Sequence, residues 1–101
     1  MKISIIIPCF NESKTIEAIL QKISNLKSTH NFEIIVVDDN STDGTRNILQ
    51  NECKEFYTTL LLNEKNFGKG YSVRKGIEIS TGNILLIQDA DLEYDPKDYD
   101  K

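Results

Sequence analysis

The chain has 101 residues, of which 39% are hydrophobic and 28% charged, and its net charge of −4 gives no reason to expect nucleic-acid binding. This is the length of one domain, which buries about 65% of the surface that its unfolded chain exposes. The apolar runs, such as residues 5–8 and 84–87, are far too short to span a bilayer. Cys9 and Cys53 lack metal-ligand spacing, so we expect two buried or half-buried free thiols in a reducing cytoplasm.

The first part of the chain predicts a strand followed by a helix. Residues 3–7 (ISIII) are nearly all apolar and β-branched, as in a strand buried on both faces, and Pro8 is expected to end this strand. From Ser13 onward apolar residues recur at helical spacing, and Ser13 or Asn11 is the expected N-cap. The apolar positions of this helix are Ile16, Ile19, Leu20, Ile23 and Leu26.

The same alternation continues in the middle of the chain. Residues 33–37 (EIIVV) predict a second buried strand, which is followed at once by the polar segment DDNSTDGT. A short helix is expected from about residue 43 to 54, with Ile48 and Leu49 facing inward. The middle of the chain therefore repeats the strand–helix unit of its beginning.

Two more strands flank the last predicted helix. Residues 58–62 (TTLLL) predict the third strand and residues 84–88 (ILLIQ) the fourth. Between them, a helix from about 70 to 80 is expected to turn Val73 and Ile77 inward.

The order β-α-β-α-β-α-β predicts an α/β fold with a Rossmann-like parallel sheet, right-handed crossovers and strand order 3-2-1-4. After the fourth strand, Asp95 and Pro96 are typical of the start of another helix, and the chain ends soon afterwards at Lys101. We therefore expect one domain over residues 1–101 that is incomplete at its C-terminus.

Each predicted strand leads into a polar segment. These segments are PCFNE, DDNSTDGT, NEKNFGKG and QDADLE, in chain order. In open parallel sheets, ligands bind beyond the carboxyl ends of the strands. Since these ends meet at one edge of the sheet, the four segments are expected to line one ligand site.

The last of these segments carries three acids close together, Asp89, Asp91 and Glu93. Like charges this near one another cost stability unless a cation lies among them. In an extended segment, residues two apart project the same way, so Asp89 and Asp91 are predicted to hold one cation, with Glu93 as a weaker candidate. Carboxylate oxygens without His or Cys suit Mg²⁺ or Mn²⁺, which keep positions open for phosphate oxygens.

The second and third segments add candidates for nucleotide binding. Asp39 is favoured as an acceptor for a base N–H or a ribose hydroxyl, whereas residues 41–44 have the chemistry of a turn and helix cap. NFGKG lacks the GxxxxGK[ST] spacing of a P-loop ATPase, although Lys69 between two glycines could approach an anion. Arg74 could pair with Asp39 or with phosphate. The aromatic residues Phe10, Phe67 and Tyr71 could each stack on a base or pack within the protein.

The segments IIIPCFNE, IIVVDDNSTDGT, NFGKGYSVRKG and STGNILLIQDADLEYDP resemble family 2 glycosyltransferases of the GT-A fold, most closely the dolichyl-phosphate mannose synthase-like branch. They occur in that family's order and spacing and cover essentially the whole chain. The resemblance implies the N-terminal half of a GT-A fold, a UDP- or GDP-linked sugar donor, and a divalent metal. It also implies an inverting transferase of glycan or cell-wall biosynthesis, located in the cytoplasm or at the cytoplasmic face of a membrane.

The resemblance also implies roles for particular residues. The first-strand segment would cradle the base and ribose, the acid after the second strand would contact them, and the DxD-type motif would bind ribose and the metal diphosphate. Together with Lys69, the candidate donor-binding residues are Pro8, Phe10, Glu12, Val37, Asp39, Asp89, Ala90 and Asp91, and the candidate metal ligands are Asp89, Asp91 and Glu93. A catalytic base, where one is used, is expected in a C-terminal half beyond this chain.

The acceptor remains open between a lipid phosphate, whose oxygen is already ionised, and a saccharide, whose hydroxyl needs a base. Membrane association is expected only through further segments or through a lipid acceptor. The alternative is a truncated module that binds nucleotide or a partner without turnover. Exposed apolar surface on the open side of the fourth strand would favour that alternative, or a homodimer.

Overall fold

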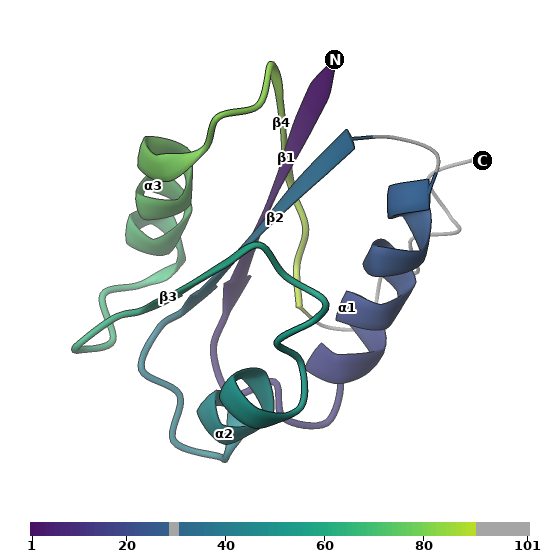
Figure 1. Ribbon diagram of the computed structural model, residues 1–101. Helices are drawn as coiled ribbons and strands as arrows, with labels where there is room; N and C mark the ends of the chain where they lie inside the picture. The colour runs from purple at the N-terminus through teal and green to yellow at the C-terminus, as the bar shows by residue number, and fades with distance from the viewer. Residues whose placement is uncertain (29–30, 91–101) are drawn as a thin grey trace.

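The computed structural model describes residues 1–28 and 31–90 (Figure 1). The elements are β1 (Lys2–Cys9), α1 (Ile16–Ser24), the 3₁₀-helix η1 (Asn25–Ser28), β2 (Asn31–Asp38), α2 (Thr45–Asn51), β3 (Thr59–Leu62), α3 (Lys69–Ile79) and β4 (Ile84–Ile87). The four strands form one parallel sheet in the order β3-β2-β1-β4. The predicted α/β class, element order and strand order are therefore confirmed.

The strand register brings the four carboxyl ends to one edge of the sheet. Cys9 at the end of β1 lies opposite Asp38 at the end of β2, which in turn lies opposite Leu62 at the end of β3. On the other side of β1, Ile6 lies opposite Ile87, the last residue of β4. The segments that follow β1, β2, β3 and β4 all leave the sheet from this carboxyl edge.

The expectation that Pro8 ends the first strand is wrong, because β1 continues to Cys9. The carbonyl oxygen of Ile6 accepts a hydrogen bond from the Gln88 N–H on the β4 side. In a parallel sheet, the backbone groups of alternate residues point to the same neighbouring strand, so the backbone nitrogen of Pro8 also faces β4. The pairing of β1 with β4 has already ended at Ile6 and Ile87. The N–H that proline lacks is therefore not needed there.

One face of the sheet packs against α1, which lies on the opposite side of the sheet from α3 (Figure 1). The sheet contributes Ile5, Ile7, Cys9, Ile34 and Val36 to this core, and α1 contributes Ile16, Ile19, Leu20 and Ile23. The predicted inward position of Leu49 of α2 is confirmed, and Ile48 is partly buried against the same cluster. Alternate strand residues thus supply one large apolar face for two helices.

The start and end of α1 differ from the prediction. Thr15, not Ser13 or Asn11, is the N-cap residue, and it makes no side-chain capping bond. The α-helix stops at Ser24 and narrows into η1, so Leu26 leaves the apolar stripe and is 39% exposed.

The other face of the sheet packs against α3, which contacts β1 and β2. The predicted inward orientation is wrong for Ile77, which is 40% exposed, while Val73 is half-buried. The buried residues of α3 are Ser72 and Gly76. A Cβ atom added to Gly76 would lie 2.6 Å from Cγ2 of Ile6, so α3 approaches the sheet too closely for a large side chain.

The predicted fourth strand is β4, and its apolar side chains are exposed. All four of its residues, Ile84 to Ile87, are between 40% and 45% exposed, because within the described part of the chain β4 pairs with β1 alone. The open side of the fourth strand therefore carries exposed apolar surface. No helix within residues 1–28 and 31–90 has the length and apolar character needed to cross a bilayer.

Candidate functional site

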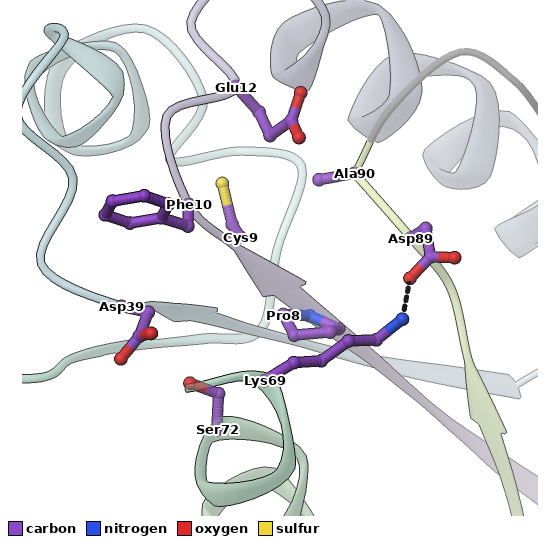
Figure 2. A pocket seen from close by; sticks show the side chains of 9 residues that line it. All are labelled: Pro8, Cys9, Phe10, Glu12, Asp39, Lys69, Ser72, Asp89 and Ala90. Atoms are coloured by element: carbon purple, nitrogen blue, oxygen red, sulfur yellow. Dashed lines mark hydrogen bonds and ion pairs between the residues drawn. The ribbon is translucent and has the colours of Figure 1, made fainter. Parts of the chain in front are cut away.

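A hollow of about 250 Å³ opens at the carboxyl edge of the sheet (Figure 2). Its lining residues are Pro8, Cys9, Phe10, Glu12, Asp39, Lys69, Ser72, Asp89 and Ala90. They come from the ends of β1, β2 and β4 and from the start of α3, which follows β3. The structure therefore brings all four polar segments together, and every candidate donor-binding residue among the described residues except Val37 lines this hollow.

The remaining candidates are Val37, Asp91 and Glu93. Val37 is fully buried inside the sheet, so its side chain does not reach the hollow. Asp91 and Glu93 lie outside the described residues, and the predicted sharing of one cation by Asp89 and Asp91 stays a prediction. Conversely, Ser72 lines the hollow although it was not predicted. The sequence feature that could have predicted Ser72 is its spacing of three residues from Lys69, because this spacing places both residues on one face of a helix.

The loops after β1 and β2 are tied together by reciprocal hydrogen bonds. The N–H of Asn11 donates to Ser41 Oγ over 2.9 Å, and the N–H of Thr42 donates to Asn11 Oδ1 over 2.7 Å. Asn11 has a φ of 53°, a left-handed conformation that asparagine tolerates better than most residues. These bonds fix the loop that carries Phe10, a residue that is 43% exposed and lines the hollow.

The first of the two neighbouring aspartates after β2 is a structural residue. Asp38 is fully buried and accepts hydrogen bonds from Ser41 N–H over 3.0 Å and from Ser41 Oγ over 2.6 Å. The guanidinium of Arg46 pairs with it, with Nε 2.5 Å from Oδ2, and also donates to the carbonyl oxygen of Asn63. Asp38 thus joins the ends of β2 and β3 to the start of α2.

The second aspartate, Asp39, lines the hollow and also holds the loop after β3. Its Oδ1 accepts hydrogen bonds from the Phe67 N–H over 2.8 Å and from Asn63 Nδ2 over 2.9 Å. Its Oδ2 accepts a hydrogen bond from the Gly68 N–H over 2.9 Å. This carboxylate, only 4% of whose residue surface is exposed, therefore positions the beginning of α3.

The suggested pairing of Arg74 with Asp39 is not formed, because Arg74 lies on another surface of α3 beside Tyr71 and Lys75. Phe67 and Tyr71 pack on each other with ring centroids 4.4 Å apart, and neither lines the hollow. Of the three candidate aromatic residues, Phe10 alone presents its ring to this site.

The backbone around Asp89 is held at both neighbouring residues. Before it, the Gln88 N–H donates to the carbonyl oxygen of Ile6 over 2.9 Å. After it, the carbonyl oxygen of Ala90 accepts a hydrogen bond from Thr15 Oγ1 over 2.7 Å. The Asp89 carboxylate is thereby fixed at the mouth of the hollow, where its side chain is 37% exposed.

The thiol of Cys9 forms part of the wall without reactive chemistry. Burial raises its pKa far above the ordinary value, and the nearby carboxylates of Asp38 and Glu12 raise it further. The thiol form is therefore favoured at neutral pH, which makes Cys9 a poor thiolate ligand and a poor nucleophile. Cys9 and Cys53 are both free and buried, as the sequence predicted.

The donor atoms at the hollow fit a hard dication only in part. Within the described residues, no three His, Cys, Asp or Glu side chains lie close enough together to hold a metal by themselves. Asp89 supplies one half-exposed carboxylate. Mg²⁺ is commonly bound by one or two carboxylates together with substrate phosphates and water, so this donor set suits a cation that arrives with a diphosphate.

Comparison with known proteins agrees with this geometry. The family model "Glycosyl transferase family 2" matches residues 4–101. The chain belongs to glycosyl transferase family 2. A relative within this family, dolichol-phosphate mannosyltransferase of Pyrococcus furiosus, is 33% identical over 97 residues, and the match covers 96% of this chain and 28% of the relative. This family 2 chain thus spans under a third of that protein.

Solved glycosyltransferase structures share the fold of this family 2 chain. The mannosyltransferase PcManGT of Pyrobaculum calidifontis, in complex with GDP-Man and Mn²⁺, gives a TM-score of 0.77 at 29% identity over 88% of this chain and 27% of its own. TarS 1–349 of S. aureus, in complex with UDP-GlcNAc, gives 0.77 at 30% identity over 90% of this chain and 27% of its own. The predicted N-terminal part of a GT-A fold is therefore confirmed.

Proposed function

We propose that this chain is the donor-binding part of a glycosyltransferase that uses a UDP- or GDP-linked sugar. The observation that carries the proposal is the convergence of an exposed aromatic ring, acidic side chains and one lysine on a single hollow in a family 2 domain. In open parallel sheets this edge is where nucleotides bind. The volume of about 250 Å³ suits part of such a donor, since whole-ligand pockets measure about 300–1,000 Å³.

The lining residues divide by chemistry. Phe10 offers a ring for stacking on the base, and Glu12 and Asp39 offer acceptors to base and ribose donors. Lys69 offers an ammonium to the phosphates, and Asp89 offers carboxylate oxygens to a dication. Pro8 and Ala90 shape the wall between these groups.

We further propose that Asp89, Asp91 and Glu93 hold Mg²⁺ or Mn²⁺, as the relation to a Mn²⁺-containing mannosyltransferase suggests. The bound ion would offset the charge that develops on the departing nucleoside diphosphate. The acceptor oxygen attacks the anomeric carbon from the face opposite the diphosphate, and the bond from that carbon to the diphosphate oxygen breaks. The sugar is transferred with inversion.

A polyprenyl phosphate is the acceptor that we favour over a saccharide. The relative from P. furiosus is named for a dolichol-phosphate acceptor. The phosphate oxygen of such a lipid is ionised at neutral pH, so attack needs no base from the protein. This acceptor would place the reaction at a membrane surface, for which we propose the cytoplasmic face.

A second candidate function is binding of nucleotide or of a protein partner without turnover. It is favoured by the apolar residues of β4, which are 40–45% exposed and could pair with another copy of the chain. A glycosylated lipid formed on incubation with nucleotide sugar and polyprenyl phosphate would establish the transferase, because binding without turnover yields no product.

The donor site is tested by calorimetric titration of UDP and GDP in Mn²⁺ and in EDTA. We expect metal-dependent binding that Asp89→Asn and Asp91→Ala each weaken at least tenfold, or about 1.4 kcal/mol, because each removes a ligand of the ion. Glu78→Gln is the control, because it removes the same charge from the outer surface of α3. This substitution should leave the affinity for UDP and GDP unchanged. Equal affinities in Mn²⁺ and EDTA would refute the metal role.

A further inference from the structure

Lys69 and Asp89 form an ion pair across the mouth of the hollow. Lys69 Nζ lies 2.5 Å from Asp89 Oδ1, and Figure 2 shows the lysine side chain reaching from α3 past Pro8 to the end of β4. Among the described residues, Lys69 is the cation that pairs with Asp89. The carboxylate proposed for a dication is therefore already neutralised by a residue of the protein itself.

The backbones on both sides of this pair are fixed. The N–H of Gly68, directly before Lys69, donates to Asp39, and the carbonyl oxygen of Ala90, directly after Asp89, accepts from Thr15. The side chains nevertheless remain accessible, with 61% of Lys69 and 37% of Asp89 exposed. Exposed ion pairs are weak, so the ammonium can leave Asp89 without rearrangement of the fold.

An ammonium and a dication cannot occupy the same side of Asp89 together. A Mg²⁺ ion binds carboxylate oxygen at about 2.0–2.1 Å, and an ammonium nitrogen 2.5 Å from Oδ1 fills that position. The two cations also repel each other. A dication that binds Asp89 through Oδ1 must therefore displace the lysine side chain.

We propose that Lys69 is an exchangeable counter-ion, which neutralises Asp89 in the donor-free protein and moves to the donor phosphates when a dication takes its place. The inference rests on the proposed function of the hollow as a nucleotide-sugar site. Without nucleotide, the displaced ammonium of Lys69 can form hydrogen bonds only with water. With a nucleoside diphosphate present, the ammonium forms charge-assisted hydrogen bonds with phosphate oxygens instead. Dication and diphosphate therefore strengthen each other's binding, and this coupling is reciprocal.

The experiment compares Lys69→Met with the unaltered chain in titrations of Mn²⁺ alone, of UDP and GDP alone, and of each nucleotide with Mn²⁺. We expect Lys69→Met to bind Mn²⁺ alone at least threefold more tightly, because no ammonium competes for Asp89. The same variant should bind UDP or GDP more weakly in Mn²⁺, because the phosphates lose a partner. The ratio of the Mn²⁺ affinity with nucleotide to the Mn²⁺ affinity without it should be smaller in Lys69→Met than in the unaltered chain.

Lys75→Met is the matched control. Lys75 lies on the same helix, its Nζ is 3.8 Å from Glu78, and its substitution removes the same charge away from Asp89. Lys69→Arg keeps the charge at the mouth, so it should retain the weak Mn²⁺ binding of the unaltered chain. Circular dichroism of each variant verifies folding.

The outcomes distinguish this inference from the proposed function. If Lys69→Met binds Mn²⁺ no more tightly than Lys75→Met does, the counter-ion role is overturned, while metal-dependent nucleotide binding by the unaltered chain still supports the donor site. If the unaltered chain binds neither UDP nor GDP in Mn²⁺, both proposals fail. An increased Mn²⁺ affinity together with a decreased nucleotide affinity supports both.

Discussion

Two adjacent aspartates with the same chemistry have different surroundings after β2. Asp38 is enclosed by Ser41 and Arg46 and serves the fold. Asp39 faces the hollow and at the same time accepts hydrogen bonds from the N–H groups of Phe67 and Gly68. At the scale of single residues, a side chain proposed for donor binding thus also positions the segment that carries Lys69.

Asp39→Asn is expected to loosen the start of α3 even without any nucleotide. An asparagine side chain has one acceptor oxygen and an amide group that cannot accept the Gly68 N–H. Losing that hydrogen bond costs about 1.4 kcal/mol, which corresponds to about tenfold faster amide exchange at Gly68. Exchange at Val36, within β2, is the internal control. Unchanged exchange at Gly68 would show that Asp39 does not position this loop.

The helix α3 packs closely on the sheet because its buried residues have small side chains. Its buried surface consists of Ser72 and Gly76, and Gly76 lies directly on Ile6 of β1. Ser72 Oγ accepts a hydrogen bond from Asn63 Nδ2 over 3.0 Å, so polar and small residues make the contact with the sheet. This close approach brings the first turn of α3, and with it Lys69, to the carboxyl edge.

Gly76→Ala is expected to destabilise the fold, and Gly70→Ala on the same helix is its control. The new Cβ at position 76 would lie 2.6 Å from Ile6, and overpacking of this kind costs about 1–3 kcal/mol. A Cβ at Gly70 meets no atom within 4 Å, so that substitution should be neutral or stabilise by up to about 1 kcal/mol. Urea unfolding of both variants measures the difference. Equal midpoints would mean that α3 does not pack this closely.

The whole molecule has two polar edges with different tasks. The carboxyl edge holds the candidate site, while the opposite edge is fastened by Glu33 of β2, which is 8% exposed. Glu33 accepts hydrogen bonds from Ser4 Oγ over 2.7 Å and from the Thr81 N–H over 2.8 Å, and Lys2 Nζ lies 3.9 Å away. This carboxylate therefore joins β1 and β2 to the segment that enters β4.

The Glu33 network predicts a loss of stability in acid. Burial alone would raise the pKa of Glu33, but hydrogen bonds from Thr81 and Ser4 and the charge of Lys2 outweigh it, so the pKa lies below the usual 4.5. A carboxyl whose pKa is lowered by folding stabilises the protein at pH values above its pKa in the unfolded chain. That contribution is lost as the pH falls through its pKa in the folded protein.

Urea unfolding between about pH 6 and pH 3 measures this loss, and Glu33→Gln should lose less stability over that range than the unaltered chain. Some dependence will remain in the variant, because hydrogen bonds from Thr45 and Ser13 outweigh burial and lower the pKa of Asp43 to about 2. An equal decline in both proteins would show that Glu33 is not a source of acid sensitivity.

The amino-acid sequence by itself determined the order of elements, the order of strands and the edge at which the candidate site lies. Apolar β-branched runs that alternate with helical patterns leave few parallel topologies, and each of these sends the segment after every strand to one edge. For this reason the sequence alone assigns Phe10, Asp39, Lys69 and Asp89, which are far apart along the chain, to one candidate site.

Only the tertiary structure decided how closely the elements approach and which polar groups meet. Periodicity predicted Ile77 on the inner face of α3, but the small residues Ser72 and Gly76 let the helix approach the sheet, and this left Ile77 half-exposed. The bonds of Asp39 to Gly68 and of Lys69 to Asp89 join residues 29 and 20 positions apart. Such partners depend on distances across the sheet, which no local pattern of residues specifies.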